Sequence, residues 1–336
     1  MIRLNHMHIH LPGFRLEDIQ LEIRAGDFFA LIGPTGSGKS LILEGLMGLM
    51  PLTRGQIFFK DREITRLAVE KRPLAMVYQD FALFPHLDVT QNICYGTRYH
   101  RIAKTEVKNR LDRLVSVLGL ERILKRKPAT LSGGEKQRTA LARSLILNPR
   151  VLLLDEPLSA LDPVFRDEAK ALLKTIHREL DMTLVMVSHD FNDVVYLANR
   201  AALIREGRMV QQGPTLDIFD RPGSRFAAEF TGMKNILPLE VLDRIGLQTR
   251  VAPESHHNWM GIRPEEIRFA PDASVENRFC GEVVGMARQG IFTRVRLRAR
   301  GVEFEAAWPG HYLDGAAQGP GQRVDFGVPA RSVHTF

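Results

Sequence analysis

Short apolar runs and amphipathic stretches alternate along most of the chain. Asp27–Ile32, Val151–Leu154 and Thr183–Val187 are apolar runs of strand length, as expected for strands of a parallel sheet that is covered on both faces. Ser40–Met50 and Pro163–Leu180 have helical character and follow the first and second of these runs. Strand and helix in alternation predict a doubly wound α/β sheet.

A further amphipathic stretch lies at Lys104–Leu124. Its apolar residues Leu111, Leu114, Val115 and Leu118 recur at helical spacing, and charged residues occupy the other face. We expect this helix to belong to a helical insertion in the sheet domain.

The pattern changes after about Gly232. Ile291–Arg298 and Val302–Ala306 alternate apolar with polar residues, which is typical of short strands with one exposed face. Because Gly and Pro residues break these strands, the sequence predicts a small, OB-like β-barrel.

Charge supports a boundary between the two regions. From Glu240 to the end the chain has 12 Arg, 12 Asp or Glu and no Lys, so the whole net charge of +7 lies before that point. We therefore predict a first domain at residues 1–232, with its helical insertion at about 80–148, and a C-terminal β-barrel at 236–336.

Composition limits the class of protein. With 44% apolar and 25% charged residues, the chain falls in the range of folded soluble proteins. It has no run of roughly 20 apolar residues and no signal-peptide pattern at its start, which predicts a cytoplasmic location. Cys94 and Cys280 are far apart, so neither a disulfide framework nor a zinc site is expected. The net charge of +7 is compatible with nucleic acid, with an anionic membrane surface or with a solvated surface that has no specific partner.

A glycine-rich segment follows the first predicted strand. It fits the phosphate-loop pattern, in which backbone N–H groups close around phosphate oxygens at a helix N-terminus. With the residue that follows, the segment consists of Gly33, Pro34, Thr35, Gly36, Ser37, Gly38, Lys39, Ser40 and Leu41. In this pattern Lys39 reaches the β- and γ-phosphates and Ser40 binds Mg²⁺. The strand before it and the helix after it are the context that the pattern requires, so these residues predict a nucleotide site.

Two acids end the second buried strand. Asp155 and Glu156 follow Val151–Leu154, and open α/β sheets bind ligands at the carboxyl ends of such strands. We expect Asp155 to hold Mg²⁺, directly or through water, and Glu156 to orient or deprotonate the attacking water. A solvated acid pair at a strand end is the alternative interpretation.

A second candidate anion site lies at LSGGE, residues 131–135. Ser132 is placed to cap a helix whose first N–H groups are left bare by Gly133 and Gly134. Taken alone, the segment is also explained by an ordinary helix N-cap.

The order and spacing of these motifs resemble those of the ABC ATPases. In that family the signature helix binds the γ-phosphate of ATP held by the other subunit. The resemblance implies that Ser132, Gly133, Gly134 and Glu135 complete a partner's site. It also implies a P-loop NTPase fold with a mixed sheet, ATP and Mg²⁺ as ligands, and hydrolysis by a homodimer.

Three more positions match the family's pattern. Gln79 in VYQD resembles the loop glutamine that senses Mg²⁺ and links the ATP site to the helical insertion. Asp162 in LSALD resembles the aspartate that communicates across the dimer, and His189 in VMVSHD resembles the switch histidine that contacts the γ-phosphate. A lone histidine is more often structural, and it is the surrounding motifs that favour a catalytic role for His189.

One feature of the family has no clear counterpart in this sequence. ABC ATPases usually stack the adenine on an aromatic residue ahead of the phosphate loop. The nearest candidates here are His10, Leu11 and Phe14. The resemblance does not choose among them.

The whole chain resembles importer subunits in which a cassette precedes a C-terminal barrel. GPTGSGK, VYQDFALFPHLDV, GIRPEEIRFA and the terminal ARSVHTF are most similar to the molybdate/tungstate importer ATPases. Importers of sulfate, ferric iron, polyamines or sugars are the alternatives. The resemblance implies two integral membrane permease subunits, a periplasmic or extracellular solute-binding protein, and no specific nucleic acid partner. It further implies a peripheral position on the cytoplasmic face of the inner or plasma membrane.

The C-terminal barrel departs from part of that group. In some members it binds the oxyanion through a Ser-x-Arg-Asn segment, and the corresponding stretch here, Ser274–Asn277, has Glu276 in place of the arginine. Because a carboxylate repels an oxyanion, this change argues against anion sensing. Positive charge is available instead at Arg278, Arg294, Arg296 and Arg298. A solvated strand face explains the alternate arginines more simply.

The competing class is a soluble ABC ATPase that acts on DNA or ribosomes. Members that repair DNA carry a long coiled coil or a zinc hook with paired Cys, and translation factors usually carry two cassettes. This chain has one cassette, no paired Cys and no sustained heptads. Its basic first region keeps that alternative open, because excess Lys and Arg give non-specific affinity for nucleic acid. A barrel that serves dimerisation rather than regulation is compatible with either class.

Overall fold

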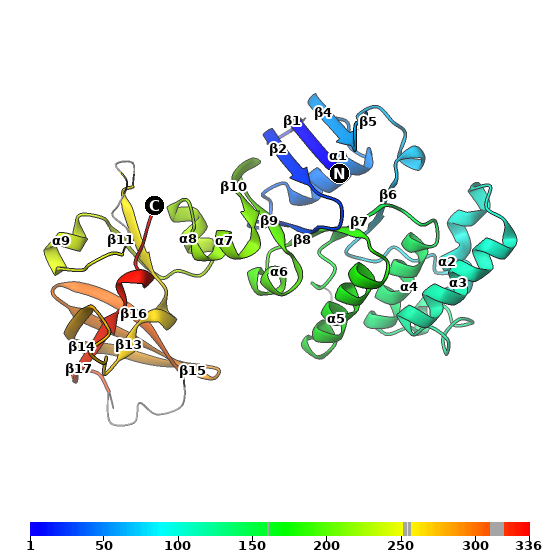
Figure 1. Cartoon of the computed structure of the whole chain (residues 1–336). Coiled ribbons are helices and arrows are strands. Elements are labelled where there is room, and N and C mark those ends of the chain that lie inside the picture. Colours follow the sequence, from blue (N-terminus) through cyan, green and yellow to red (C-terminus); the bar gives the residue numbers. More distant parts are fainter. Residues whose placement is uncertain (160, 251–253, 255–256, 310–318) are drawn as a thin grey trace. The chain divides into compact units, whose positions relative to one another are not determined.

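The computed structural model describes residues 1–159, 161–250, 254, 257–309 and 319–336 (Figure 1). Ala160, in the LSALD segment, lies outside the described residues.

The chain divides into two compact units, Met1–Leu216 and Asp217–Phe336. The second unit begins before the boundary at 232–236 that charge predicts. It takes in helix α8 (Arg225–Phe230) because Ala228 packs against Met233 and Phe336. These apolar contacts place α8 in the second compact unit.

A six-stranded sheet forms the centre of the first unit. Its strands lie in the order β10 (Arg208–Pro214), β9 (Arg200–Arg205), β3 (Phe28–Ile32), β8 (Thr183–Ser188), β7 (Val151–Asp155) and β6 (Leu74–Val77). Neighbouring strands are parallel except for the antiparallel pair of β9 and β10. β3, β7 and β8 are buried along almost their whole length, so their apolar runs do not alternate. The predicted α/β fold with a mixed sheet is confirmed.

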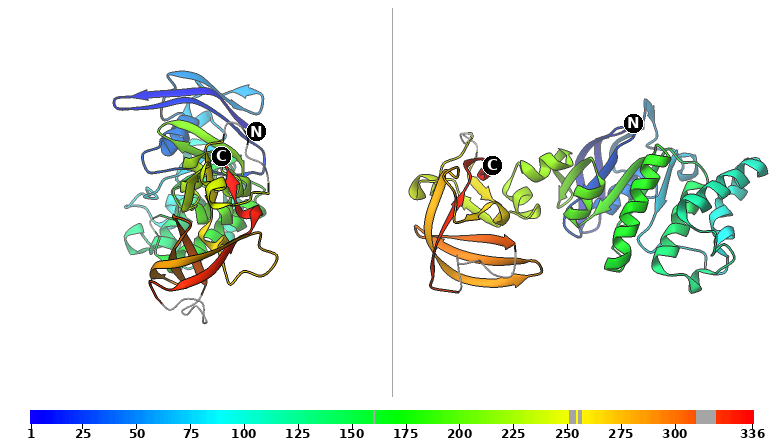
Figure 2. Two further views of the ribbon diagram at one scale, coloured as in Figure 1. Left: turned by 90° about the vertical axis from the view of Figure 1, so that its left-hand side faces the viewer. Right: turned by 60° about the horizontal axis from the view of Figure 1, so that its bottom comes forward.

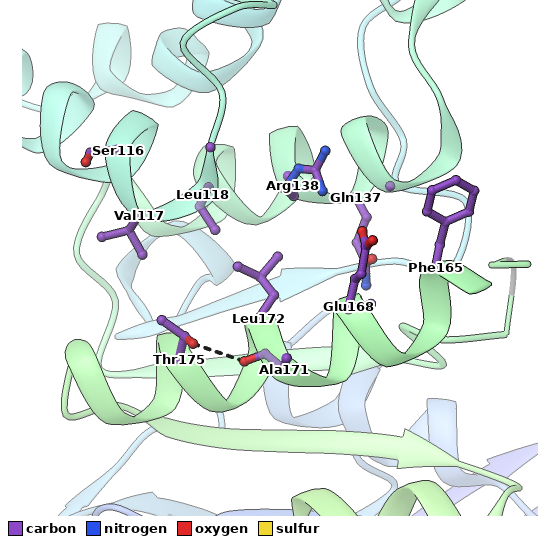
Figure 3. Close-up of a pocket in the computed structure, with 13 residues that line it drawn as sticks. Ser116, Val117, Leu118, Gln137, Arg138, Phe165, Glu168, Ala171, Leu172 and Thr175 are labelled. Atoms are coloured by element: carbon purple, nitrogen blue, oxygen red, sulfur yellow. Dashed lines mark hydrogen bonds between the residues drawn. The ribbon is translucent and has the colours of Figure 1, made fainter. Parts of the chain in front are cut away.

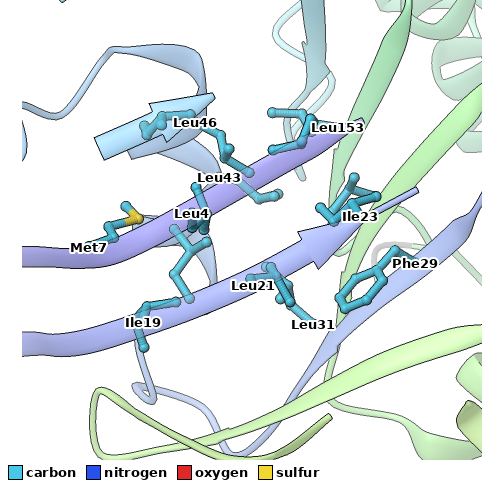
Figure 4. Close-up of a cluster of buried hydrophobic side chains, with 14 of the residues drawn as sticks. Leu4, Met7, Ile19, Leu21, Ile23, Phe29, Leu31, Leu43, Leu46 and Leu153 are labelled. Carbon is cyan, nitrogen blue, oxygen red and sulfur yellow. The ribbon is translucent and has the colours of Figure 1, made fainter. Parts of the chain in front are cut away.

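A smaller antiparallel sheet packs beside it through a shared core. Its strands are β2 (Phe14–Ile23), β1 (Ile2–Leu11), β4 (Arg54–Phe59) and β5 (Arg62–Glu63). Figure 4 shows Leu4 and Ile19 of this sheet in one cluster with Leu43 of helix α1 (Lys39–Met47), Phe29 of β3 and Leu153 of β7. Helix α1 is therefore held between two sheets by apolar contacts, which fixes the loop that precedes it.

The helices that lie wholly within the described part of the first unit complete its layers. They are α1, α2 (Val89–Cys94), α3 (Lys104–Leu118), α4 (Gly133–Leu145), α5 (Pro163–Glu179) and α6 (Phe191–Leu197). α2, α3 and α4 all lie between β6 and β7 in the chain. α1 and α3 end earlier than the apolar pattern predicts, at Gly48 (φ +82°) and Gly119 (φ +62°). Glycine adopts this left-handed conformation without strain and stops the helix.

The second unit contains two antiparallel sheets. The three-stranded sheet consists of β11 (Asn235–Pro238), β12 (Trp259–Ile262) and β18 (His334–Thr335). The five-stranded sheet consists of β13 (Arg268–Phe269), β17 (Arg323–Val328), β14 (Asn277–Gln289), β15 (Phe292–Ala299) and β16 (Val302–Pro309). The right-hand view of Figure 2 shows the larger sheet curling around its own core, where the rings of Phe279 and Phe304 lie 5.4 and 5.5 Å from that of Phe326. The predicted OB-like β fold is confirmed.

Shorter elements connect these sheets and helices. α7 (Thr215–Asp220) spans the division between the units, and α9 (Val241–Ile245) follows β11. Single 3-10 turns lie at Val69–Lys71, Tyr95–Tyr99, Pro128–Thr130, Pro264–Glu266 and Ala330–Ser332.

Candidate functional site

The carboxyl ends of four parallel strands meet at one edge of the main sheet. β3 pairs with β8, β8 with β7, and β7 with β6, all in parallel. The segments that directly follow these strands therefore lie side by side, as they do in ligand-binding α/β sheets. The predicted site residues in these segments are Gly33–Ser40, Gln79, Glu156 and His189.

The phosphate loop packs tightly against its surroundings. Gly33 has φ +149°, and a Cβ there would lie 2.1 Å from the carbonyl oxygen of Ile204. Gly38 has φ +98°, and a Cβ there would lie 2.5 Å from the side chain of Leu16. Both positions need glycine. At Gly33 a Cβ would collide with a backbone atom, which cannot move aside, and at Gly38 the positive φ disfavours any residue with a side chain.

Lys39 is enclosed by this loop. Its side chain is 4% exposed, and its ammonium donates to Gly33 O at 2.9 Å, to Pro34 O at 2.8 Å and to Ser37 Oγ at 3.4 Å. Burial lowers the pKa of Lys39, and the charges of Glu156 and Asp155 oppose that shift. The ammonium is thus held at the N-terminus of α1, where the helix dipole also favours an anion.

Ser40 and Asp155 join the phosphate loop to the end of β7. The Ser40 hydroxyl donates to Asp155 Oδ1 at 2.8 Å. Burial raises the pKa of Asp155; the Ser40 hydrogen bond and Lys39 lower it, and the neighbouring charge of Glu156 raises it further. Hydroxyl and carboxylate oxygens are ligands that suit Mg²⁺. In the described parts of the chain no group of three or more His, Cys, Asp or Glu is arranged to hold a metal ion, so an ion here would need further oxygens from a phosphate or from water.

Glu156 faces His189 across the same edge. Glu156 Oε1 lies 3.3 Å from His189 Nδ1, and the two side chains are 20% and 52% exposed. The backbone of Glu156 has φ +45°, an uncommon conformation for a residue with a side chain. Ser159 holds it by donating to Glu156 O from its N–H at 3.2 Å and its hydroxyl at 2.9 Å. A partly enclosed carboxylate beside an imidazole is suited to accept and hold a proton.

A small cavity adjoins this pair. It measures about 10 Å³, close to the least space that holds one water molecule, and Glu156 and His189 line it together with Arg166 and Asp193.

Two predicted residues make no side-chain hydrogen bond or ion pair with the other site residues that the structure describes. Gln79 is exposed two residues after β6, and within the described residues it makes no hydrogen bond or ion pair. Asp162 is exposed at the N-cap of α5, and its side chain makes no cap hydrogen bond.

The LSGGE segment forms the N-terminus of α4. Ser132 Oγ accepts from Glu135 N at 3.3 Å, and Glu135 Oε2 accepts from Ser132 N at 2.8 Å, which is a reciprocal capping box. The bond from Ser132 N lowers the pKa of Glu135, and Arg126, whose Nη1 lies 3.0 Å from Glu135 Oε1, lowers it further. The cap that the sequence predicts at Ser132 is present.

Within the described residues, no steric contact requires glycine at Gly133 or Gly134. A Cβ on Gly133 or Gly134 would meet its nearest neighbours at 3.7 and 3.8 Å, which is ordinary contact. Neither Gly133 nor Gly134 has a positive φ. Gly133 is exposed and Gly134 is partly exposed, so the start of α4 is accessible to a ligand or to another chain.

The structure separates the three candidates for adenine stacking. Phe14 lies against the phosphate loop, because a Cβ on Gly38 would lie 2.9 Å from Phe14 Cζ. His10 instead faces the ring of His8, at 6.2 Å between centroids, and Leu11 is 36% exposed.

Gly207 supports the phosphate loop and was not among the predicted residues. It lies in the turn between β9 and β10, where its N–H donates to Ser37 O at 3.2 Å and its carbonyl accepts from Glu17 N at 2.9 Å. It has φ +76°, and a Cβ would lie 1.8 Å from Arg15 O. Glu206 and Gly207 both have positive φ, at +49° and +76°, as a tight hairpin turn requires, but the contact of Gly207 with the phosphate loop is visible only in three dimensions.

A cavity of about 510 Å³ lies elsewhere in the first unit, between α3, α4 and α5 (Figure 3). Leu118, Arg138 and Leu172 line it, one from each helix. Gly134 is the one predicted site residue along its wall. The cavity is therefore separate from the strand edge that holds Ser40 and Asp155.

The carboxylate of Glu276 in the second unit has its own partner. Glu276 Oε2 accepts from Ala330 N at 3.0 Å. This bond lowers the pKa of Glu276, as do the charges of Arg331 and Arg250.

Three of the four arginines that the sequence offered as positive charge have partners as well. Arg294 pairs with Glu305, and Arg298 pairs with Glu303 at 2.6 Å on the neighbouring strand. Arg278 Nε donates to Val275 O at 3.1 Å. These contacts favour the interpretation of the alternate arginines as a solvated strand face.

Comparisons with known proteins agree with this geometry. Residues 16–159 match the ABC transporter family and residues 260–336 match the TOBE domain. The chain is 35% identical to the Molybdate/tungstate import ATP-binding protein WtpC of Pyrococcus abyssi over 91% of both chains. The chain belongs to the ABC transporter family. Its resemblance to ABC ATPases is thereby confirmed, and as an ATP-binding subunit of this family it is an ATPase coupled to transport.

Two further ABC proteins are similar to this chain. The Sulfate/thiosulfate import ATP-binding protein CysA of Xanthomonas campestris is 35% identical over 92% of both chains. A solved ATP-binding cassette in a dimeric, post-hydrolysis state bound to ADP and Pi covers 64% of this chain and 99% of its own, with a TM-score of 0.56 and 28% identity. None of the helices in the described residues has the length and apolar character that crossing a bilayer requires.

Proposed function

We propose that this chain energises an importer for a small oxyanion, with molybdate or tungstate as the solute. The proposal of ATP hydrolysis is supported chiefly by the strand edge, where Ser40 is hydrogen-bonded to Asp155 and Glu156 lies beside His189. The choice of solute rests on three relatives of 34–39% identity whose names specify molybdate/tungstate import. Sulfate is the second candidate, because a sulfate/thiosulfate relative matches over a similar length. Ferric iron, polyamine and sugar are more distant alternatives.

The phosphate loop is the proposed holder of the ATP phosphates. Its backbone N–H groups and the N-terminus of α1 offer donors and a positive dipole to an anion, and Lys39 adds a charge that is already enclosed there. Ser40 and Asp155 would hold Mg²⁺, with Gln79 as a further ligand, and the ion would neutralise charge on the β- and γ-phosphates. The oxygen donors present fit that ion.

Glu156 and His189 are the proposed catalytic residues. Glu156 orients the attacking water and accepts its proton, while the water oxygen bonds to the γ-phosphorus and the bond from that phosphorus to the ADP oxygen breaks. His189, 3.3 Å from Glu156, would contact the γ-phosphate and hold the carboxylate in place. The strained backbone at Glu156 supports a functional constraint at this position.

The LSGGE segment is the proposed complement of a second copy's site. Ser132, Gly133, Gly134 and Glu135 would contact the γ-phosphate of ATP bound to the partner, and Asp162 would lie at the shared interface. The exposure of Gly133 and Gly134 supports this role, as does the dimeric state of the related cassette. Two ATP molecules would then be enclosed between two copies of the chain.

Membrane partners follow from the same proposal. Two integral permease subunits would dock at the helical insertion of residues 80–148, and a periplasmic or extracellular solute-binding protein would deliver the oxyanion. The chain would lie peripherally on the cytoplasmic face of the membrane. The cassette domain at 1–232 would carry the chemistry and the barrel at 236–336 would serve regulation or dimerisation.

Uptake measurements in cells that lack the gene test this proposal. The wild-type chain should restore uptake of radioactive molybdate and tungstate, and Glu156→Gln should not, although it still binds a fluorescent ATP analogue. Restored uptake of sulfate alone would overturn the choice of solute. Restored uptake by Glu156→Gln would overturn the assignment of the base.

A further inference from the structure

Arg166 links the loop of Asp162 to the loop of His189. It lies in the first turn of α5, where its N–H donates to Asp162 O at 3.1 Å. Its guanidinium reaches in the other direction, with Nη2 2.7 Å from Asp190 Oδ2 and Nε 3.1 Å from Asp193 Oδ2. The backbone of Arg166 thus continues the helix that starts at Asp162, and its side chain pairs with the residue that follows His189.

Asp190 shapes the turn that holds His189. Its two carboxylate oxygens have separate partners: Oδ1 accepts from Asn192 N at 2.9 Å and caps α6, whereas Oδ2 accepts from Arg166. Its backbone N–H donates to Ser188 Oγ at 3.0 Å. Because His189 lies between Ser188 and Asp190, the position of its imidazole depends on this turn.

The chemistry of Arg166 suits this position. A planar guanidinium offers donors in a fixed fork and serves two carboxylates at once, which an ammonium on a flexible stem does less well. Asp193 is 3% exposed and has a second cation, because Lys170 Nζ lies 3.6 Å from its Oδ1. Among the described residues Asp190 has Arg166 as its ion-pair partner. Removing Arg166 thus leaves Asp193 paired and Asp190 unpaired.

Arg166 also lines the small cavity beside Glu156 and His189. The guanidinium therefore borders the space next to the proposed base without touching the phosphate loop. This placement separates its role from nucleotide binding.

We propose that Arg166 is a positioning residue that, through Asp190, fixes His189 toward Glu156. The inference rests on the proposed function, which gives Glu156 and His189 their part in hydrolysis. It predicts an effect on turnover rather than on ATP affinity.

Steady-state ATPase kinetics of the full chain test it. Arg166→Met should lower kcat about 10-fold to 100-fold, the scale expected when a catalytic group is displaced, and should leave KM for ATP within about twofold. Lys170→Met is the matched control, because it removes a cation from Asp193 and leaves Asp190 paired; its kcat should stay near that of the wild type. Arg166→Lys should recover part of the lost turnover.

A double-variant cycle separates positioning from general stability. In a His189→Ala background, Arg166→Met should cause no further loss of kcat, because the residue that it positions is already gone. An equal, independent loss in both backgrounds would overturn the inference. A kcat loss in His189→Ala with none in Arg166→Met would also overturn it and would leave the proposed function intact. Wild-type kcat in His189→Ala would contradict the proposed function itself and this inference with it.

Asp190→Asn covers the case in which Arg166→Met unfolds. Asparagine keeps the Oδ1 cap of α6 and removes the charge that faces Arg166. Thermal unfolding of this variant should resemble that of the wild type, and kcat should fall as it does for Arg166→Met. Unchanged kcat in a folded Asp190→Asn chain would overturn the inference.

Discussion

The hydroxyl of Ser40 donates a 2.8 Å hydrogen bond to the carboxylate of Asp155, which lies 115 positions further along the chain. The bond ties the first turn of α1 to the carboxyl end of β7. The phosphate loop and the acid pair of Asp155 and Glu156 consequently keep one relative position. This arrangement supports the proposed Mg²⁺ site and gives it a direct test.

Asp155→Asn should raise the Mg²⁺ requirement of the ATPase. Asparagine can still accept the Ser40 hydrogen bond, but it loses the charge that binds the ion. The Mg²⁺ concentration for half-maximal activity should rise about 10-fold or more, since altered metal surroundings typically cost 10-fold to 100-fold in affinity. Titration of activity with Mg²⁺ at fixed ATP measures this, and an unchanged midpoint would contradict the assignment of Asp155.

The same residue predicts a dependence on pH. Burial raises the pKa of Asp155, and the form that binds Mg²⁺ is the ionised one, present above that pKa. As the pH falls, Mg²⁺ affinity should therefore decline at a higher pH than an exposed aspartate would allow. Mg²⁺ titrations at a series of pH values should show this decline in the wild type and not in Asp155→Asn. A decline shared by both chains would assign it to another group.

Gly207→Ala should destabilise the turn that supports the phosphate loop through its bond to Ser37. The new Cβ would lie 1.8 Å from Arg15 O, a backbone atom, at φ +76°. Gly13→Ala is the matched control, because Gly13 has φ +82° but no atom within 4 Å of its Cβ. The control should lose about 1 kcal/mol from left-handed backbone strain, and Gly207→Ala about 2 kcal/mol more, from overpacking. Denaturant unfolding checks both values, and equal losses in the two variants would contradict the account.

Much of this site is predictable from local sequence. The phosphate loop at Gly33–Ser40 can be predicted because its glycines serve local backbone geometry. The N-cap at Ser132 can be predicted because a helix cap is a local hydrogen bond. Asp155 and Glu156 follow a buried strand, and the edge of a parallel sheet is where such residues gather.

Other features depend on contacts between distant segments. Gly207 and Arg166 act through partners far away in the chain, at Ser37 and Asp190, so no spacing of residue types reveals them. The early ends of α1 and α3 follow from single left-handed glycines inside an apolar pattern that continues beyond them. The second compact unit includes α8 because Ala228 packs against Met233 and Phe336, a long-range apolar contact that net charge does not report.

Phe14→Ala should weaken ATP binding more than His10→Ala or Leu11→Ala. Phe14 is the candidate whose ring lies against Gly38 of the phosphate loop. A base stacked on an aromatic ring contributes about 1–3 kcal/mol, so affinity should fall about 5-fold or more. Titration with a fluorescent ATP analogue measures each variant, and unchanged affinity in Phe14→Ala would remove this residue from consideration.

The wild-type barrel should not respond to free oxyanion. The carboxylate of Glu276 already accepts from Ala330 N and stands near Arg331 and Arg250, so added molybdate meets a negative charge there. Glu276→Gln keeps the acceptor, removes that charge and should gain a molybdate-dependent rise in Tm. A rise of equal size in the wild type would contradict this explanation.

The central claim is that two copies of this chain share each ATP site. Lys39→Ala removes the phosphate-loop cation, and Ser132→Arg fills the space at the start of α4; each chain alone should be inactive. Mixed at equal amounts they form some dimers with one intact site, so ATPase activity should return to about a quarter of the wild-type value if pairing is random. The account predicts this recovery, measured as phosphate release from the mixture. A mixture as inactive as its parts would contradict it.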